Sequence, residues 1–476
     1  MSEKTIGIAS EDISFDIYEK NIYMPFVSGA YRPGTEEDRA IAKQFGKESG
    51  ILVPTNYFDL APSELPPEVS DWYREMHKKL LLDYSKYEGE RHEKFENSDL
   101  PVTLWFDGDR KQKEKGLRTG IVHRTMASPD ETIEFMISRA IDKMRPQLDQ
   151  MVDFTKEKIA FVLSSSTVTD YKAGDFPSYN DEDQQTEIVN SILSEQGMTA
   201  KEIKVLDEGC AGCTAAVDEA VKILEKNPDI RMVIVATGER LQDIIRRDDL
   251  GTTPLFGDGA AVNVLINQDL AEKMDGRGLK LLGSARHLDD SDEAKKMLCN
   301  RPELANEENT RGVEMNGGIV FEYATAYMHD LVRALSQELG VAPQHVLAHQ
   351  ANARIVDYIK LKFRSEDGMN MDFPLDMEYG NASSVTVFRL FDKLLQSGEI
   401  ESYKTGDIVA MVAFGMGLHT NAVMGEVVDF SKRKPSAGYN GIDRRSRFVT
   451  CSGELSLLVL ILLFSLLSVK VMMCTI

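Results

Sequence analysis

Three short strings, far apart in the chain, carry side chains that can act on thioesters. They read EGCAGC at residues 208–213, HQANARI at 349–355 and GNASS at 380–384. Their reactive members are the thiol of Cys210, the imidazole of His349 and the carboxamide of Asn381. A nucleophile with two hydrogen-bonding groups is what thioester exchange followed by carbon–carbon bond formation requires. The strings therefore predict an active site assembled from three distant segments.

Cys210 occupies a position expected of a nucleophile. A strand-like run at residues 204–206 precedes it, and an apolar stripe typical of one helix face follows it. The stripe consists of Ala216, Val217, Ala220, Val221 and Leu224. Because a helix N-terminus favours the thiolate, we expect a lowered pKa. Two alternatives remain: a buried structural cysteine, or a redox C-x-x-C pair of Cys210 with Cys213 that lacks the Trp-Cys-Gly-Pro context of thioredoxin.

Two glycine-containing strings complete the pattern, LFGDGAA at 255–261 and AFGMGL at 413–418. The glycines of the first suit a tight turn into a strand, so we expect an architectural rather than a phosphate-binding role. In order and setting, the five strings resemble those of β-ketoacyl-acyl carrier protein synthase III, a condensing enzyme of the thiolase superfamily. The resemblance runs from about Arg118 to about Val428. It implies a duplicated, layered α/β fold (α-β-α-β-α) with mixed sheets.

The resemblance also implies roles for the reactive residues. In the family, the matching His and Asn hydrogen-bond the thioester carbonyl of a malonyl group and stabilise the enolate that forms as carbon dioxide leaves. We therefore expect Cys210, His349 and Asn381 to be catalytic. The backbone N–H groups of Cys210 and Met416 match the oxyanion hole. The resemblance implies no metal and no redox cofactor, because the acyl group arrives on coenzyme A or on the phosphopantetheine of a carrier protein.

A further group of residues is expected to bind the substrate. Its members are Arg118, Asn352, Arg354 and Phe414. Arg118 matches an Arg that contacts the coenzyme A nucleotide, and Asn352 matches a residue near the pantetheine arm. Two departures weaken the coenzyme interpretation, since Glu114 stands where the family has Trp and Leu250 stands where it has Arg.

Basic residues gather on the predicted helix after His349. They are Arg354, Lys360, Lys362 and Arg364. Acyl carrier proteins are acidic, so this face is a candidate docking surface for such a partner. The alternative is an ordinary solvated helix face.

The hydrophobic pattern indicates how the strings are positioned. Nearly continuous apolar runs at 158–163, 231–237 and 408–414 are typical of strands covered on both faces. Residues 345–348 read as a strand that ends at His349, and 354–363 read as the helix that follows. The strand, active residue and helix around Cys210 thus recur around His349, which indicates a duplicated fold.

The predicted domains follow from this repeat. They are an N-terminal thiolase-like half at residues 1–285 with an insertion at about 31–98, a C-terminal half at 286–430, and a linker with a hydrophobic tail at 431–476. Residues 455–469 are apolar or Ser, and basic residues precede them, as in a segment that spans a membrane. Three interpretations of residues 455–476 remain: a C-terminal membrane anchor, a foreign tail from a misread gene end, or a packed core helix.

Charge and cysteine content restrict which partners and which cellular compartment we expect for the protein. The chain has 476 residues and a formal net charge of −22, which argues against a nucleic-acid partner because phosphate neutralisation needs a basic surface. Its five cysteines form no paired framework of the secreted kind, and its start lacks the apolar core of a signal peptide. We therefore expect a cytoplasmic protein. The resemblance further implies that it is a homodimeric enzyme that acts on acyl and malonyl thioesters.

Two other functions remain open. One is an acyltransferase to an oxygen or nitrogen nucleophile, which would not need Asn381. The other is a degenerate partner subunit tethered to a membrane, against which the intact triad argues.

Overall fold

The computed structural model describes residues 6–54, 119–121, 123–149, 157–167, 182–245, 252, 255–289, 291, 298–300, 313–415 and 419–432. Outside these residues lie Glu114, Arg118, Leu250, Met416, residues 55–98 of the predicted insertion, and the tail from residue 433 onward. Among the described residues, none of the helices has the length and apolar character needed to cross a membrane.

A mixed sheet of 11 strands runs through the described part of the chain. Its order is β13 (His345–Ala348), β14 (Ile408–Phe414), β15 (His419–Asp429), β10 (Arg277–Leu288), β2 (Ile22–Pro25), β9 (Gly259–Asn267), β8 (Met232–Glu239), β6 (Ile159–Ser164) and β7 (Ala200–Leu206), with β1 (Ser14–Ile17) beside β10 and β3 (Gly29–Tyr31) beside β9. In one half β6, β7 and β8 are parallel and β9 is antiparallel. In the other half β13 and β14 are parallel and β15 is antiparallel. Strand β2 pairs with both β9 and β10 and so joins two halves of the same design.

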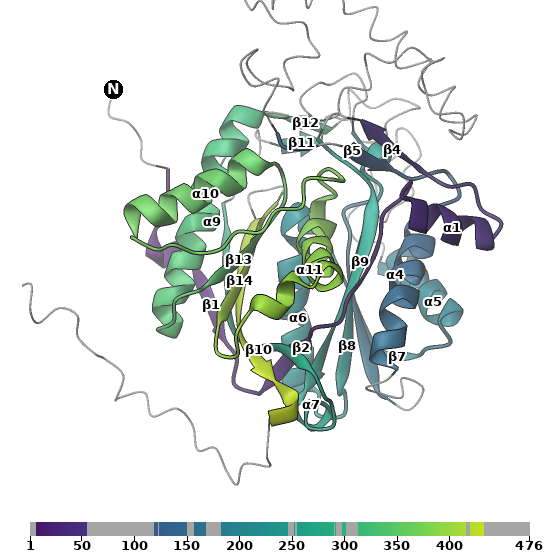
Figure 1. Ribbon diagram of the computed structural model, residues 1–476, viewed down its shortest axis with the longest axis horizontal. Coiled ribbons are helices and arrows are strands. Elements are labelled where there is room, and N and C mark those ends of the chain that lie inside the picture. Colours follow the sequence, from purple (N-terminus) through teal and green to yellow (C-terminus); the bar gives the residue numbers. More distant parts are fainter. Residues whose placement is uncertain are drawn as a thin grey trace, which may run out of the picture. The chain divides into compact units, whose positions relative to one another are not determined.

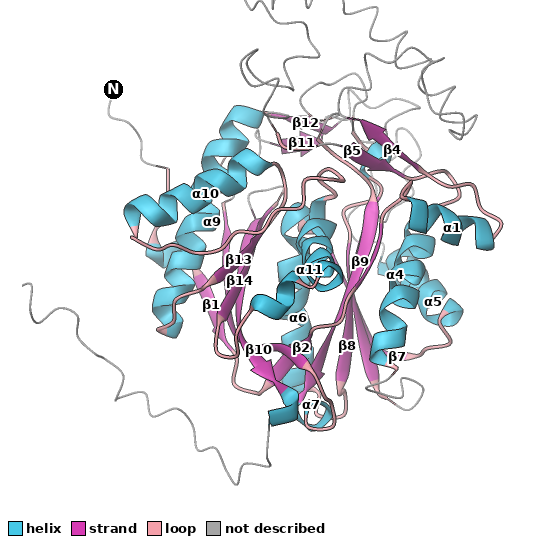
Figure 2. Ribbon diagram, viewed as in Figure 1, coloured by secondary structure: helices cyan, strands magenta, loops and turns pink. Residues whose placement is uncertain are grey.

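Helices lie between the two halves of the sheet and on both outer faces, so helices and sheet halves alternate in five layers (Figures 1 and 2). The central layer is α6 (Gly212–Lys226) and α11 (Thr386–Ser397); the outer layers are α4 (Ile133–Leu148) with α5 (Glu182–Glu195), and α9 (Gly317–Leu339) with α10 (Ala353–Glu366). Alternate strand residues face different layers, since Val235 of β8 packs with α6 while Ile234 packs with α4. Likewise Met411 of β14 packs toward the centre and Val412 toward α9 and α10. The predicted thiolase-like fold is confirmed.

The remaining described elements are short α-helices, 3-10 helices (labelled η) and strands. They are η1 (Ser10–Asp12), α1 (Glu36–Gln44), β4 (Ile51–Pro54), β5 (His123–Met126), η5 (Gly209–Ala211), η6 (Leu241–Asp243), α7 (Gln268–Ala271), β11 (Leu298–Asn300), β12 (Val313–Met315), η8 (Ser383–Val385), η9 (Glu399–Ser402) and η11 (Phe430–Lys432). Helix ends follow local chemistry. The side chain of Thr35 accepts a hydrogen bond from Asp38 N–H at the start of α1, and Gly340 ends α9 with a left-handed φ of 66°.

The apolar runs identified the buried strands well. The runs at 158–163, 231–237 and 408–414 correspond to β6, β8 and β14, and every residue of these strands is buried. The strand at 345–348 and the helix after it are β13 and α10. The predicted boundary after residue 285 falls inside β10, and the division into domains stays a prediction.

Candidate active site

The nucleophile lies in a tight turn between β7 and α6. Cys210 is the middle residue of η5, and Gly209 before it has a positive φ of 51°, a conformation that suits glycine. The end of β14 packs on this turn. A Cβ at Gly415 would lie 2.7 Å from Ala211 N and 3.0 Å from Cys210 N. Only a residue without a side chain fits there, so Gly415, directly after β14, lies against the backbone N–H of Cys210.

Burial dominates the acidity of this thiol. Cys210 is 8% exposed, and burial raises its pKa to about 12. Hydrogen bonds from the side chains of Ser383 and Asn381 lower the pKa, and the carboxyl of Glu239 raises it. The predicted lowering by the helix N-terminus is therefore wrong, because the loss of hydration outweighs the nearby N–H groups. The same hydrogen bonds place Cys210 beside Asn381, as predicted.

Cys213 shares this burial. It is fully buried in the core between the sheet halves, both thiols are free, and burial raises the pKa of Cys213 to about 12 as well. A redox C-x-x-C pair needs a reactive thiol with a lowered pKa. The redox alternative therefore finds no support in this environment.

His349 follows β13 and is 3% exposed. Its backbone N–H donates to the carbonyl of Val412 at 2.8 Å, and its Nδ1 lies 2.6 Å from the hydroxyl oxygen of Thr386. Burial, and then the positive charge of Arg389, lowers the pKa of His349 to about 3. The imidazole is therefore neutral near pH 7, and one ring nitrogen carries a hydrogen while the other accepts one.

One short segment joins all three predicted catalytic residues. Asn381 is 4% exposed, and its side-chain oxygen accepts the N–H of Ser383 at 2.9 Å, which leaves the amide nitrogen to act as a donor. Ser383 in turn hydrogen-bonds Cys210, and Thr386 bonds His349. Ser383 has a φ of 49°, the one positive φ of a non-glycine residue in the described ranges. Such a backbone costs about 1–3 kcal/mol and is typical of functional sites.

The first glycine-containing string supports this segment. Asn381 N–H donates to Leu255 O at 2.7 Å, and Gly257 N–H donates to Asn381 O at 2.9 Å. The carboxyl of Asp258 accepts N–H groups from Ala127 and Gln242 at 2.8 and 3.1 Å. These internal hydrogen bonds agree with the predicted architectural role.

Sequence reasoning missed a buried carboxyl near the nucleophile. Glu239, at the end of β8, accepts hydrogen bonds from the hydroxyls of Ser166, Thr167 and Ser384 at 2.9, 3.0 and 2.7 Å. Burial raises its pKa to about 7. A carboxylate directly after a buried apolar run is the signal that could have identified it. Thr386 and Arg389 were missed too, because their roles depend on contacts that local sequence does not reveal.

The residues predicted to bind substrate are spread over two regions. Asn352 caps α10 by accepting Ile355 N–H at 3.1 Å. Arg354 is exposed on α10, with its guanidinium carbon 5.5 Å from the ring centre of Phe321. Phe414, at the end of β14, is buried and packs in the core of the C-terminal half. The structure thus gives Asn352 a structural contact, and its role toward pantetheine stays a prediction.

Comparisons with known proteins agree with this fold. Residues 206–298 match the family described as 3-oxoacyl-(acyl-carrier-protein) synthase III, and residues 341–427 match its C-terminal counterpart. The β-ketoacyl-(acyl-carrier-protein) synthase III of Chlamydia caviae is 27% identical over 334 residues, covering 69% of this chain and 91% of that protein. The Aquifex aeolicus protein of that name is 27% identical over 312 residues, covering 64% and 88%.

Solved structures share the fold. A 3-oxoacyl-(acyl-carrier-protein) synthase III from Aquifex aeolicus superposes with a TM-score of 0.56 at 19% identity, covering 85% of this chain and 99% of that one. The priming β-ketosynthase of the R1128 polyketide pathway gives 0.56 at 21% identity, covering 87% and 98%. The chain is therefore similar in sequence and in fold to condensing enzymes of the thiolase superfamily. Within that class, the chain is β-ketoacyl-acyl carrier protein synthase III-like.

Proposed function

We propose that this protein catalyses the decarboxylative Claisen condensation of an acyl thioester, held on Cys210, with a malonyl thioester, in fatty acid or polyketide-type biosynthesis. The observation that carries the proposal is the segment from Asn381 to Thr386, which hydrogen-bonds both Cys210 and His349. The relatives' names support the same reaction class.

In the first step the sulfur of Cys210 attacks the thioester carbonyl carbon, the carbon–sulfur bond forms, and the thiol proton ends on the sulfur of the departing thiol. The resulting oxyanion is stabilised by the backbone N–H of Cys210 and, by analogy, that of Met416. The close approach of Gly415 to Cys210 N supports this assignment. Collapse of the tetrahedral adduct expels the first thiol and leaves an acyl group on Cys210.

In the second step two N–H groups receive the malonyl carbonyl oxygen. The amide nitrogen of Asn381 is one donor, and Nε2 of His349 is the other. A hydrogen on Nε2 requires Nδ1 to accept, and the hydroxyl of Thr386 can donate to Nδ1 at 2.6 Å in place of the carbonyl of Ser383, which lies farther away at 3.2 Å. As the carboxylate leaves as carbon dioxide, the enolate attacks the acyl carbon on Cys210, the carbon–carbon bond forms, and the sulfur departs.

This sequence of steps uses thiol, imidazole and amide groups alone. A metal or redox cofactor has no task in it. An acyltransferase to oxygen or nitrogen would need Cys210 but not the second pair of donors, so the fixed orientation of Asn381 favours condensation.

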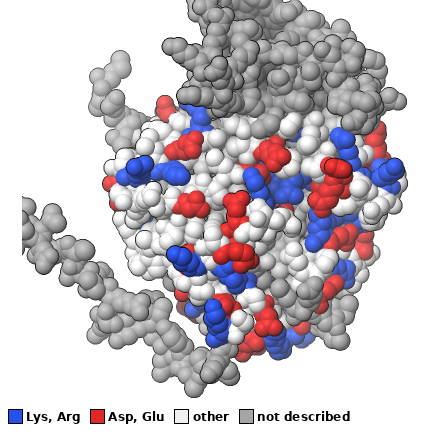
Figure 3. Space-filling view, viewed as in Figure 1, with Lys and Arg blue, Asp and Glu red and all other residues white. Residues whose placement is uncertain are grey.

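The proposal includes an acyl carrier protein as a partner that binds at α10. Arg354, Lys360 and Arg364 are exposed on α10, where Figure 3 shows basic side chains at the surface, and an acidic acyl carrier protein would complement them.

We propose a homodimer, because β7 ends the sheet and leaves an open edge in the described part of the chain. A reducing cytoplasm would keep Cys210 free.

Intact-mass spectrometry after incubation with a panel of acyl thioesters tests the first step. The wild-type protein should gain the mass of one acyl group, whereas Cys210→Ala should gain none and Cys213→Ala should behave as wild type. Acylation that survives Cys210→Ala would contradict the assignment.

A further inference from the structure

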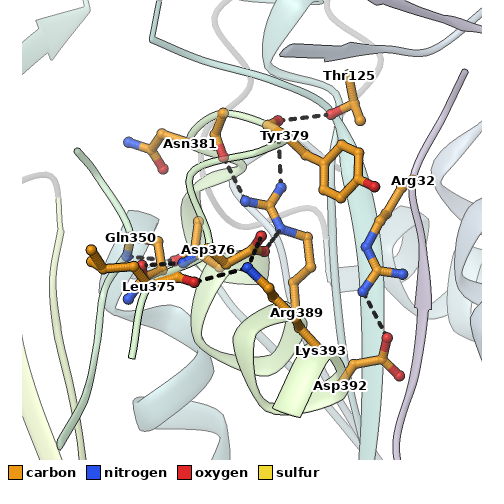
Figure 4. A network of polar contacts seen from close by, with 12 residues as sticks. Arg32, Thr125, Gln350, Leu375, Asp376, Tyr379, Asn381, Arg389, Asp392 and Lys393 are labelled. Atoms are coloured by element: carbon orange, nitrogen blue, oxygen red, sulfur yellow. Dashed lines mark hydrogen bonds and ion pairs between the residues drawn. The ribbon is translucent and has the colours of Figure 1, made fainter. Parts of the chain in front are cut away.

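A buried cation lies behind the segment that carries Asn381. Arg389, on α11, is 1% exposed. Its Nε donates to the carboxylate of Asp376 at 2.8 Å, its Nη2 to the carbonyl of Gly380 at 2.6 Å and its Nη1 to that of Tyr379 at 3.5 Å (Figure 4). An unpaired charge is costly inside a protein, so this guanidinium is stable here because these oxygens surround it.

All three acceptors belong to residues 376–380, directly before Asn381. Gly380 has a left-handed φ of 77°. The peptide group that links Gly380 to Asn381 is held from both ends, since its carbonyl bonds Arg389 and its N–H bonds Leu255 O at 2.7 Å. The hydrogen bond from Arg389 is the charged one of the two and is therefore the stronger.

The same ion pair reaches the loop that carries His349. Asp376 accepts from Arg389, and its backbone N–H donates to the side-chain oxygen of Gln350 at 2.9 Å. Gln350 follows His349 in the chain and is fully buried. The guanidinium of Arg389 thus connects, through one residue on each side, the two segments that supply the proposed donors to the malonyl carbonyl.

We propose that Arg389 is a positioning residue for decarboxylation: through Gly380 and Asp376 it fixes the distance between the amide of Asn381 and the imidazole of His349. This inference rests on the proposed function. A planar guanidinium donates in three fixed directions, whereas a Lys ammonium is a point charge on a flexible stem and cannot hold all three oxygens. Acylation of Cys210 does not involve the malonyl carbonyl that these two donors receive, so it should depend on Arg389 only weakly, through the hydrogen bond from Asn381 to the thiol.

The test separates the two half-reactions. Arg389→Lys and Arg389→Met are assayed for acylation of Cys210 by intact mass and for release of labelled carbon dioxide from a malonyl thioester. Removal of a positioned donor costs about 10²- to 10³-fold in rate. We expect a loss of about 10²-fold in decarboxylation for Arg389→Met, a smaller loss for Arg389→Lys, and acylation within about twofold of wild type. Asp376→Asn, which keeps the side-chain shape, should give the same selective loss.

Arg32→Met is the matched control. Arg32 is another mostly buried Arg of the network drawn in Figure 4, and its guanidinium carbon lies 5.7 Å from the ring centre of Tyr379. Its Nη2 forms an ion pair with Asp392 Oδ2 at 2.7 Å, whereas Arg389 pairs with Asp376. The Arg32→Met variant should leave the ratio of the acylation rate to the decarboxylation rate unchanged. Equal loss of both half-reactions in Arg389→Lys and Asp376→Asn, or decarboxylation at the wild-type rate in Arg389→Met, would overturn the inference. Wild-type protein that acylates but releases no carbon dioxide would overturn the proposed function instead.

Discussion

The reactivity of Cys210 toward an alkylating reagent should rise steeply with pH. The thiolate is the reactive form, and burial raises the pKa of this thiol from an ordinary value of 9.0 to about 12. At pH 8 an ordinary thiol is about 10% thiolate, whereas Cys210 would be about 0.01% thiolate. The thiolate fraction, and the alkylation rate with it, is therefore about 10³-fold lower than that of an ordinary thiol.

The assay is the rate of carbamidomethylation by iodoacetamide between pH 6 and pH 10, followed by intact mass. The rate should increase about tenfold for each pH unit, without a plateau in this range. Cys210→Ala supplies the background. Cys213 is fully buried and should contribute nothing until the protein unfolds.

Two further variants test the cause of this raised pKa. Glu239→Gln removes a negative charge that raises the pKa of Cys210, so its alkylation should be faster above about pH 7, where Glu239 is ionised, whereas Ser383→Ala removes a hydrogen bond that lowers the pKa and should slow alkylation. A plateau near pH 7 or 8 in the wild type would refute the reasoning. It would mean that the N-terminus of α6 lowers the pKa of Cys210 by more than burial raises it.

Four further predictions concern single side chains. Asn381→Ala should slow acylation of Cys210 by no more than the loss of one hydrogen bond to the thiol, about 2- to 13-fold, and should reduce labelled carbon dioxide release by about 10²- to 10³-fold; unchanged release would favour an acyltransferase. Thr386→Val should slow decarboxylation by about 2- to 13-fold, the equivalent of one hydrogen bond of about 0.5–1.5 kcal/mol, whereas Thr386→Ser should not. Because the pKa of Glu239 is raised from 4.5 to about 7, folding takes up a proton between these values, so its contribution to stability falls as pH rises through them. Urea unfolding from pH 4 to pH 8 should show this slope weakened in Glu239→Gln, and an unchanged slope would contradict it. Arg354→Glu should raise the apparent KM for a carrier-protein thioester and weaken its salt dependence, with little effect on a short pantetheine thioester; equal effects on both would leave α10 a solvated face.

Local sequence predicted the framework because local constraints determine it. The strands β6, β8 and β14 were recognisable because a strand covered on both faces must be apolar at nearly every position. Cys210, His349 and Asn381 were recognisable because each sits in a short string. The direction of the pKa shift at Cys210 was not, because burial depends on how α6, β14 and η8 pack together. Glu239 contacts Ser384 across 145 residues of sequence, a contact that no local pattern contains.

The central claim is that carbon–carbon bond formation follows acylation of Cys210. The most direct measurement combines an acyl thioester with a malonyl thioester labelled at its free carboxyl, and follows both carbon dioxide and the thioester product by mass spectrometry. Condensation predicts one labelled carbon dioxide released for each β-ketoacyl thioester, which carries two more carbons than the acyl donor. An ester or amide of the unextended acyl group, formed without carbon dioxide, would contradict the account.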